Sequence, residues 1–162
     1  MLLVATMVAI TLASCEKENN GTGGGGINPA GYVDLGLPSG TKWKASNEGG
    51  YYDYDSAMET FGSQLPTKEQ IEELMSLCTY TWDADRKGAV FTSTVNDKSI
   101  FLPAAGCRHC DGEVDDVGSF GGYWSSAPNG TDDAWDLYFD SGEVSIYDCS
   151  LCYGLSVRLV KN

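Results

Sequence analysis

The sequence predicts an α+β domain made of many short strands and one or two helices. Residues 121–160 alternate apolar and polar side chains at period two, the pattern of strands with one buried face. Only the segment after Pro66 shows clear helical periodicity. Short alternating segments, separated by Gly, Asn and Asp, occupy much of the remaining chain.

The composition fits one soluble domain that is neither a nucleic-acid-binding protein nor a His-dependent enzyme. The chain has 162 residues, a mean hydropathy of -0.22, a net charge of -13 and a pI of about 4.2. Such an acidic surface repels phosphate backbones. His109 is the single histidine, and no catalytic triad can be proposed. We therefore expect a monomer with no catalytic residues and no cofactor.

The N-terminus predicts a lipid anchor. Residues 1–12 are almost wholly apolar but too short to cross a bilayer as a helix, as in a signal peptide. Leu12-Ala13-Ser14-Cys15 resembles a bacterial lipobox and predicts lipidation at Cys15. The expected order is a signal peptide with the lipobox cysteine (1–15), a Gly-rich tether (16–30) and a ligand-binding domain (31–162). We expect anchoring in the bacterial outer membrane, with exposure at the cell surface.

The body of the domain should begin with a hairpin formed by residues 32–37 and 41–45. A short helix is expected over 56–61. A second helix should follow Thr67, with Thr67 as N-cap and Gln70 completing a capping box. Its apolar face would carry Ile71, Leu74, Met75 and Cys78. Further strands are expected over 79–82, 89–94 and 99–102, and a Gly- and Asp-rich loop over 107–120.

The C-terminal sheet divides into a predicted core face and a predicted outward face. Trp135, Leu137, Phe139, Val144 and Ile146 should be buried, residues 148–153 should form a loop, and Leu155, Val157 and Leu159 should resume a strand. A fixed apolar ladder with a varied polar and aromatic face is typical of a binding surface, although ordinary solvated sheets look similar. The candidate ligand-binding residues are Asp132, Asp133, Asp136, Tyr138, Asp140, Ser145, Tyr147, Asp148, Ser150, Leu151 and Tyr153.

Five motifs carry a family resemblance. They are YVDLGLPSGTKW from Tyr32, LPTKEQ from Leu65, FLPAAG from Phe101, GYWSS from Gly122 and SVRLV from Ser156. In this order they resemble lipoprotein domains related to the Fibrobacter succinogenes major paralogous domain. The resemblance implies a C-type-lectin-like fold of the formylglycine-generating-enzyme subgroup. The chain departs from the family pattern at two positions. Members often carry Cys where this chain has Ser46, so Cys78 lacks a possible partner and should be a buried free thiol. Members often carry Tyr where this chain has Cys107.

Some members of this family are variable proteins of diversity-generating retroelements. In these, errors at template adenines alter a C-terminal ligand-binding face. An AAC or AAT codon changed only at adenines cannot encode Trp, Met, Lys, Gln or Glu, and none of the outward candidates is one of these. The sequence therefore favours a diversified surface protein that binds a protein or glycan. A static adhesin or a structural envelope lipoprotein on the same fold remains the alternative.

Two CxxC pairs, Cys107–Cys110 and Cys149–Cys152, have the spacing of zinc ligands. In an exported protein, disulfides are favoured over free thiols and zinc. We expect all four cysteines in one neighbourhood, with a link from one pair to the other, while a zinc or redox protein is the less favoured alternative. The cluster Asp132, Asp133 and Asp136 could bind calcium, but solvated surface acids are commoner, and no metal site is assigned.

Overall fold

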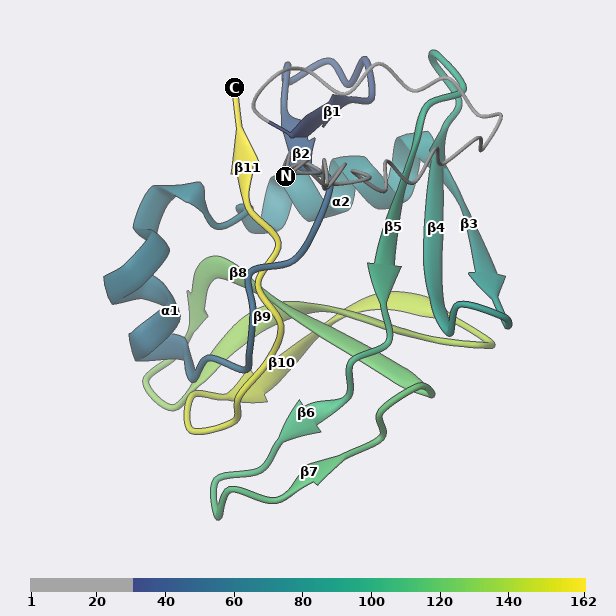
Figure 1. The fold of residues 1–162 in the computed structure, drawn as a ribbon. Helices are drawn as coiled ribbons and strands as arrows, with labels where there is room; N and C mark the ends of the chain where they lie inside the picture. The colour runs from purple at the N-terminus through teal and green to yellow at the C-terminus, as the bar shows by residue number, and fades with distance from the viewer. Residues whose placement is uncertain (1–30) are drawn as a thin grey trace, which may run out of the picture.

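The computed structural model describes residues 31–162, so the predicted signal peptide, Cys15 and the tether lie outside the described part. The fold is α+β, as predicted, with mostly antiparallel short strands and two α-helices (Figure 1). Within residues 31–162, no helix has the length and apolar character needed to cross a membrane.

Both helices begin at side-chain caps. α1 (Tyr54–Phe61) starts after Asp53, whose carboxylate accepts from the Ser56 backbone N–H, and continues into a short 3-10 turn, η1 (Gly62–Gln64). α2 (Lys68–Leu77) starts after Thr67 with the predicted capping box. It ends where Cys78 adopts an extended conformation. The buried residues of α2, Ile71 and Leu74, lie on the predicted apolar face.

The strands within residues 31–162 form four small sheets. One contains β1 (Tyr32–Asp34), β2 (Lys42–Lys44) and β11 (Val160–Lys161), so the C-terminus lies beside the first hairpin (Figure 1). A second contains β3 (Cys78–Asp83), β4 (Gly88–Ser93) and β5 (Ser99–Pro103). The third contains β8 (Phe120–Asn129), β9 (Asp133–Asp140) and β10 (Val144–Ser150), and the fourth β6 (Cys107–Arg108) and β7 (Val114–Asp115).

Three predictions about secondary structure need correction. The expected loop over 107–120 contains the β6–β7 hairpin, which backbone bonds between the two strands hold together. Residues 148–150 extend β10 instead of opening a loop, because they pair with residues 133–135 of β9. The segment from Leu155 to Leu159 is not a regular strand; it makes isolated bridges to Tyr52 and Tyr123 before β11.

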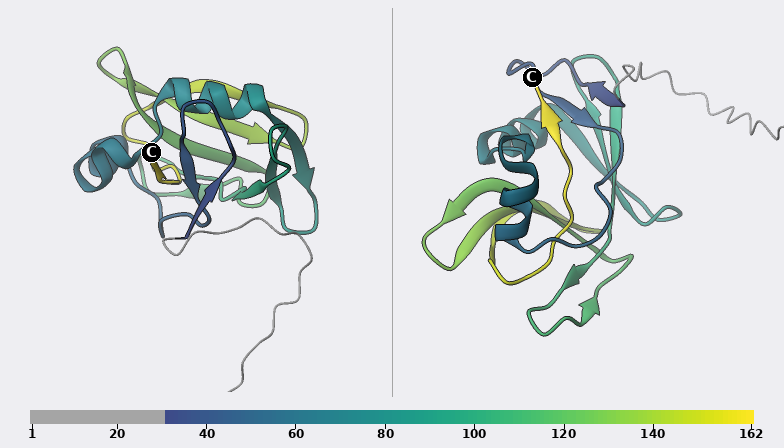
Figure 2. Two further views of the ribbon diagram at one scale, coloured as in Figure 1. Left: turned by 90° about the horizontal axis from the view of Figure 1, so that it is seen from above. Right: turned by 60° about the vertical axis from the view of Figure 1, so that its left-hand side comes forward.

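The β8–β9–β10 sheet lies between two apolar cores. One face carries Leu137 and Phe139 into a core shared with α2, β1, β2, β4 and β5. The other carries Trp124 and Ala134 into a second core shared with α1 and the segment Leu155–Leu159. Figure 2 shows α2 and α1 as separate elements packed around this sheet. The C-terminal sheet is therefore covered on both faces over part of its length.

Two local features hold this arrangement. Gly121 pairs with Phe139 across β8 and β9, and a Cβ at position 121 would overlap the Phe139 ring. The fully buried guanidinium of Arg158 donates to Asn47 Oδ1 (2.8 Å), the Lys44 carbonyl (2.7 Å) and the Phe101 carbonyl (2.8 Å). The SVRLV motif thus joins the C-terminal segment to β2, the following loop and β5.

Candidate ligand-binding site

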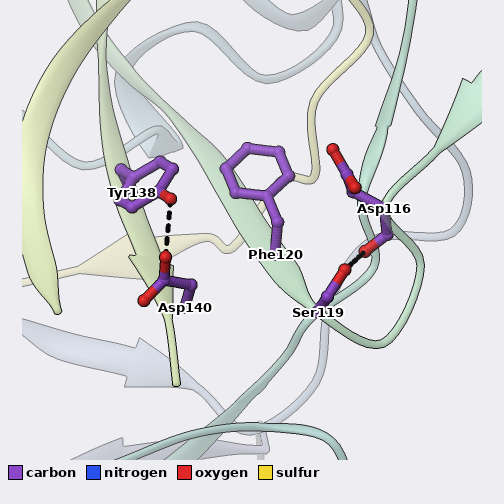
Figure 3. Close-up of a pocket in the computed structure, with 5 residues that line it drawn as sticks. All are labelled: Asp116, Ser119, Phe120, Tyr138 and Asp140. Atoms are coloured by element: carbon purple, nitrogen blue, oxygen red, sulfur yellow. Dashed lines mark hydrogen bonds between the residues drawn. The ribbon is translucent and has the colours of Figure 1, made fainter. Parts of the chain in front are cut away.

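A groove formed by two adjoining pockets runs along the β8–β9–β10 sheet. The pockets share Phe120 and Tyr138. The first pocket, of about 340 Å³, has an acidic rim formed by Asp116 and Asp140 (Figure 3). The second has a volume of about 280 Å³ and is lined by Cys107, Phe120, Asp136, Tyr138, Tyr147, Asp148, Cys149, Tyr153 and Leu155. We call the two together the aromatic–acidic groove.

Aromatic rings form the walls of the groove and support one another. The ring centroids of Tyr138 and Tyr147 are 5.0 Å apart in an edge-to-face arrangement, and those of Tyr138 and Phe120 are 5.1 Å apart. At the far wall, the Tyr153 ring packs 5.1 Å from the His109 ring. Tyr138 is therefore held from two sides and separates the two pockets.

At one end, hydrogen bonds fix Tyr138 to Asp140. The Tyr138 hydroxyl donates to Asp140 Oδ2 at 2.9 Å, as Figure 3 shows. Asp140 Oδ1 accepts from the backbone N–H groups of Gly142 (2.7 Å) and Glu143 (3.0 Å). The Gly142 N–H and the Tyr138 hydroxyl lower the pKa of Asp140, and the bond to Asp140 raises the pKa of Tyr138 to about 12. This carboxylate is ionised and well satisfied.

Asp136 was predicted to be exposed, but only 3% of its surface is accessible. Its cross-strand partners are Trp124 on β8 and Tyr147 on β10, and distant segments of the second core cover its face of the sheet. Oδ1 of Asp136 is buried without a hydrogen-bond partner. Burial, with the nearby Asp148 charge, raises the pKa of Asp136 to about 7. Asp136 is thus an unsatisfied carboxyl group in the wall of the second pocket.

Trp135 was predicted to be buried, but its side chain is only partly buried. The ammonium group of Lys68, on α2, lies 3.5 Å from the centroid of the indole ring. Leu137 and Phe139 are fully buried, as expected. Val144 and Ile146 are half-buried against the same core, since β10 is the edge strand of the sheet.

The structure brings together part of the predicted face. Six candidates line the groove: Asp136, Tyr138, Asp140, Tyr147, Asp148 and Tyr153. Of these, Tyr147 and Asp148 are exposed, and Tyr138, Asp140 and Tyr153 are half-buried. The remaining candidates lie outside the two pockets: Asp132, Asp133, Ser145, Ser150 and Leu151.

Sequence reasoning missed the lining residues that come from outside β9 and β10. Phe120 lies at the start of β8, Cys107 on β6 and Leu155 in the C-terminal segment. Asp116 and Ser119 lie in the connection between β7 and β8. Alternation along one strand carries no signal for these positions, because only tertiary packing brings them to the groove.

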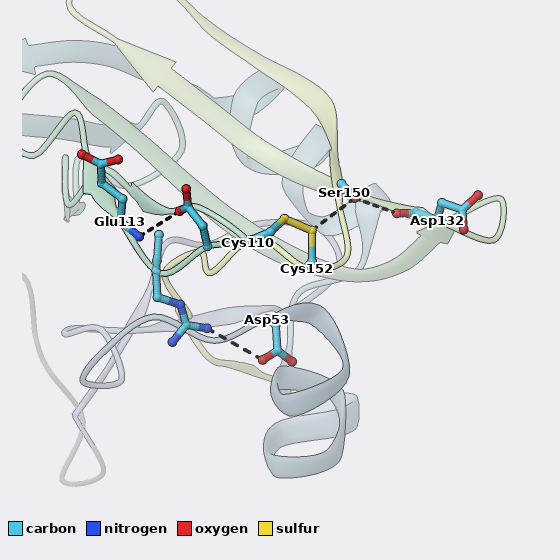
Figure 4. The surroundings of a disulfide bond; sticks show 8 residues. Asp53, Cys110, Glu113, Asp132, Ser150 and Cys152 are labelled. Carbon is cyan, nitrogen blue, oxygen red and sulfur yellow. Dashed lines mark hydrogen bonds and ion pairs between the residues drawn. A yellow bond between two sulfur atoms is a disulfide. The ribbon is translucent and has the colours of Figure 1, made fainter.

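A disulfide joins the two CxxC pairs beside the groove. Cys110, just beyond β6, is bonded to Cys152, just beyond β10, with their Cα atoms 5.1 Å apart (Figure 4). This is the expected link between the pairs. Nearby, an Arg108 guanidinium nitrogen lies 3.8 Å from an Asp53 carboxylate oxygen, which ties the hairpin to the start of α1.

The other cysteine of each pair is a thiol. Cys107 and Cys149 line the same pocket, and burial raises the pKa of both, that of Cys149 to about 12. Cys78 is a buried thiol, as predicted, with a pKa raised by burial to about 11. Within residues 31–162, no group of three or more His, Cys, Asp or Glu side chains is arranged to hold a metal ion. The Cys110–Cys152 bond also removes two of the four thiolates that a ribbon-type zinc site needs.

Comparison with known proteins gives one match. A family model described as a domain of unknown function, DUF8237, matches residues 89–160. No curated protein and no solved structure matches the chain. The matched range contains every residue that lines the groove.

Proposed function

We propose that this chain is a surface-anchored, non-enzymatic lipoprotein that binds a partner protein through the aromatic–acidic groove. The observation that supports this proposal is the chemistry of the groove. Its lining residues are Phe, Tyr, Asp, Cys, Ser and one Leu, and no Lys or Arg is among the residues of either pocket. Rigid tyrosines provide contact area at low entropic cost, and carboxylates provide directed acceptors.

The acidity of the groove favours a protein with basic groups over a glycan. A net charge of -13 repels acidic glycans, and the hydroxyl groups of a neutral glycan can donate to the unpaired Asp136 carboxyl group but bring no positive charge to complement it. Basic side chains on a protein surface are complementary to both the carboxylates and the tyrosine rings. A glycan ligand is therefore an alternative outcome of the test.

The proposed scaffold is the C-type-lectin-like fold implied by the family resemblance. The resemblance motifs fall on elements that support the groove: GYWSS lies on β8, and SVRLV contains the buried Arg158. A mixed fold of short antiparallel strands with two helices is compatible with this assignment. Fold alone does not define function, so the proposal depends on the groove.

Diversification by a retroelement is part of the proposal. The groove positions on β9 and β10 obey the adenine-codon rule. Asp136 adds support, because a buried carboxyl group without a partner costs stability, which a ligand that supplies the missing partner offsets. A nearby reverse transcriptase gene and a near-repeat of the 3′ coding segment would establish diversification. Their absence would leave a static adhesin.

Two matched triple variants of the full chain test ligand binding. The groove variant carries Tyr147→Ala, Asp148→Ala and Tyr153→Ala. The control carries Glu59→Ala, Asp85→Ala and Val95→Ala, all exposed and outside both pockets. On arrays of purified surface proteins and of glycans, the unchanged chain and the control should bind the same proteins, and the groove variant should lose them. Equal binding by both variants, or binding to glycans only, would refute the proposal.

A further inference from the structure

The second pocket contains a feature that the fold does not explain. The Asp136 side chain is almost fully buried, lines this pocket and leaves Oδ1 without a hydrogen-bond donor. Leaving a buried acceptor unpaired is costly, and the cost is larger for a charged group. Binding sites tolerate such costs when a ligand supplies the missing partner.

No Lys or Arg is among the described residues that line the pocket around Asp136. Tyr147, Asp148 and Cys149 line the same pocket from β10, and Tyr138 lines it from the strand that carries Asp136. Cys107 approaches from β6, Phe120 from β8, and Tyr153 and Leu155 from the segment after β10. Every one of these groups is neutral or acidic. A positive charge that entered the pocket would find one buried carboxylate, a second at the rim and several ring faces.

We propose that this pocket is a subsite for a primary ammonium group, as carried by a lysine side chain of the partner protein. This deepens, and rests on, the proposed function. The ammonium nitrogen would donate to Asp136 Oδ1, and its methylene stem would lie between the Tyr138, Tyr147 and Tyr153 rings. A lysine head group thus provides both the donor and the charge that Asp136 lacks.

Other cations fit the pocket less well. A quaternary ammonium has no N–H to donate, so Oδ1 would stay unpaired. A guanidinium carries five donors in a planar fork, against three for an ammonium group, so a pocket with one buried unpaired oxygen leaves more of them unsatisfied. The volume of about 280 Å³ lies just below the usual range of small-molecule pockets, which suits one side chain.

Short peptides test the subsite directly on the full chain in mild detergent. The probes are acetyl-Gly-Lys-Gly-amide and the same peptide with Nε-acetyl-lysine, Nε-trimethyl-lysine or arginine. Binding is followed by chemical-shift changes of backbone amides in β9 and β10. The lysine peptide should bind with a Kd on the order of 1 mM, and the acetylated peptide at least about tenfold more weakly.

Asp136→Asn should weaken the lysine peptide about tenfold or more, because it removes the charge and keeps the shape. Asp97→Asn is the matched control, since it removes one acidic charge at an exposed turn outside both pockets. Tyr147→Ser, at a wall position that is 47% exposed, should weaken binding several-fold. In the unchanged chain, affinity should rise about tenfold between pH 6 and pH 8, as Asp136 loses its proton.

The subsite is overturned if the lysine and acetyl-lysine peptides bind equally. It is also overturned if the trimethyl-lysine or arginine peptide binds best, if Asp136→Asn binds the lysine peptide unchanged, or if no peptide shifts β9 or β10. Any of these results, with partner binding still lost in the Tyr147, Asp148 and Tyr153 triple variant, leaves the proposed function standing. Lysine binding without any protein partner on the arrays would instead remove the proposed function and keep the subsite.

Discussion

Asp136→Asn should change the pH dependence of stability in the absence of any ligand. The folded pKa of Asp136 is raised from 3.8 to about 7, so the folded state keeps a proton that the unfolded state has already released. In this window the unfolded state binds fewer protons. The free energy of unfolding should therefore fall as the pH rises from about 4 to about 7, and then level off.

The magnitude follows from the size of this shift. Between pH 5 and the folded pKa of about 7 lie two pH units, so Asp136 should remove about 3 kcal/mol of stability at roughly 1.4 kcal/mol per unit. The asparagine variant cannot titrate and should lack this decline. Its unpaired amide adds an offset of about 1–3 kcal/mol, but the offset is the same at both pH values and cancels in the comparison.

Urea unfolding of the full chain at pH 5, 6, 7 and 8 measures the effect. The lower limit stays above the pI of about 4.2, which limits precipitation. The difference in unfolding free energy between Asp136→Asn and the unchanged chain should move by about 3 kcal/mol in favour of the variant from pH 5 to pH 8. The unfolding free energy of the Asp97→Asn variant should change with pH in the same way as that of the unchanged chain. If the Asp136→Asn curve is also parallel, Asp136 is not a buried, uncompensated acid and the argument fails.

Three further predictions concern the scaffold and the anchor. Replacing Cys110 and Cys152 together by Ser should cost about 4 kcal/mol in urea unfolding, because the bond closes a loop with a sequence separation of 42; a loss below about 1 kcal/mol would contradict the loop-entropy argument. Phe139→Ala should cost about 3–5 kcal/mol through a cavity beneath Gly121, and an unchanged unfolding midpoint would show that this core is not rigid. Cys15→Ala should abolish labelling by radioactive palmitate, and persistent label would exclude lipidation at this residue.

Local rules were sufficient wherever the signal lies within a few residues. Thr67 and Gln70 define the start of α2 because a capping box is complete within one turn. Leu137 and Phe139 are buried because period two assigns them to one face. The cross-pair disulfide followed from two cysteine pairs in a chain predicted to be exported.

Burial of Asp136 could not be predicted in the same way. The alternation of apolar and polar residues at period two predicts which residues share a face of the strand, but it does not indicate whether other segments cover that face. The covering segments are separated from β9 along the chain: Cys107 on β6 and Leu155 after β10. Phe120 and Asp116 enter the groove for the same reason. Non-local packing therefore supplies half of the groove, and the sequence of β9 and β10 supplies the other half.

The hydrogen bonds of the groove show how its side chains can vary while the fold stays constant. The Tyr138 hydroxyl donates to Asp140, and the Tyr147 hydroxyl donates to Glu143 at 3.2 Å, so both tyrosines bond neighbouring side chains. Asp140 Oδ1 in turn accepts from the backbone N–H groups of Gly142 and Glu143. The backbone at Asp140 is held by other bonds. The Tyr80 hydroxyl, on β3, donates to the Asp140 carbonyl, and the Asp140 N–H donates to the Glu143 carbonyl.

On the opposite face of β9, Leu137 pairs with Ile146 and Phe139 covers Gly121. These apolar contacts fix the register of the sheet independently of the groove side chains. A change at Tyr138 or Tyr147 then alters the ligand surface but removes few contacts from either core. Such a separation, between a backbone held by the scaffold and tyrosines held by neighbouring side chains, is what a diversified binding site requires, and it supports the function proposed for this groove.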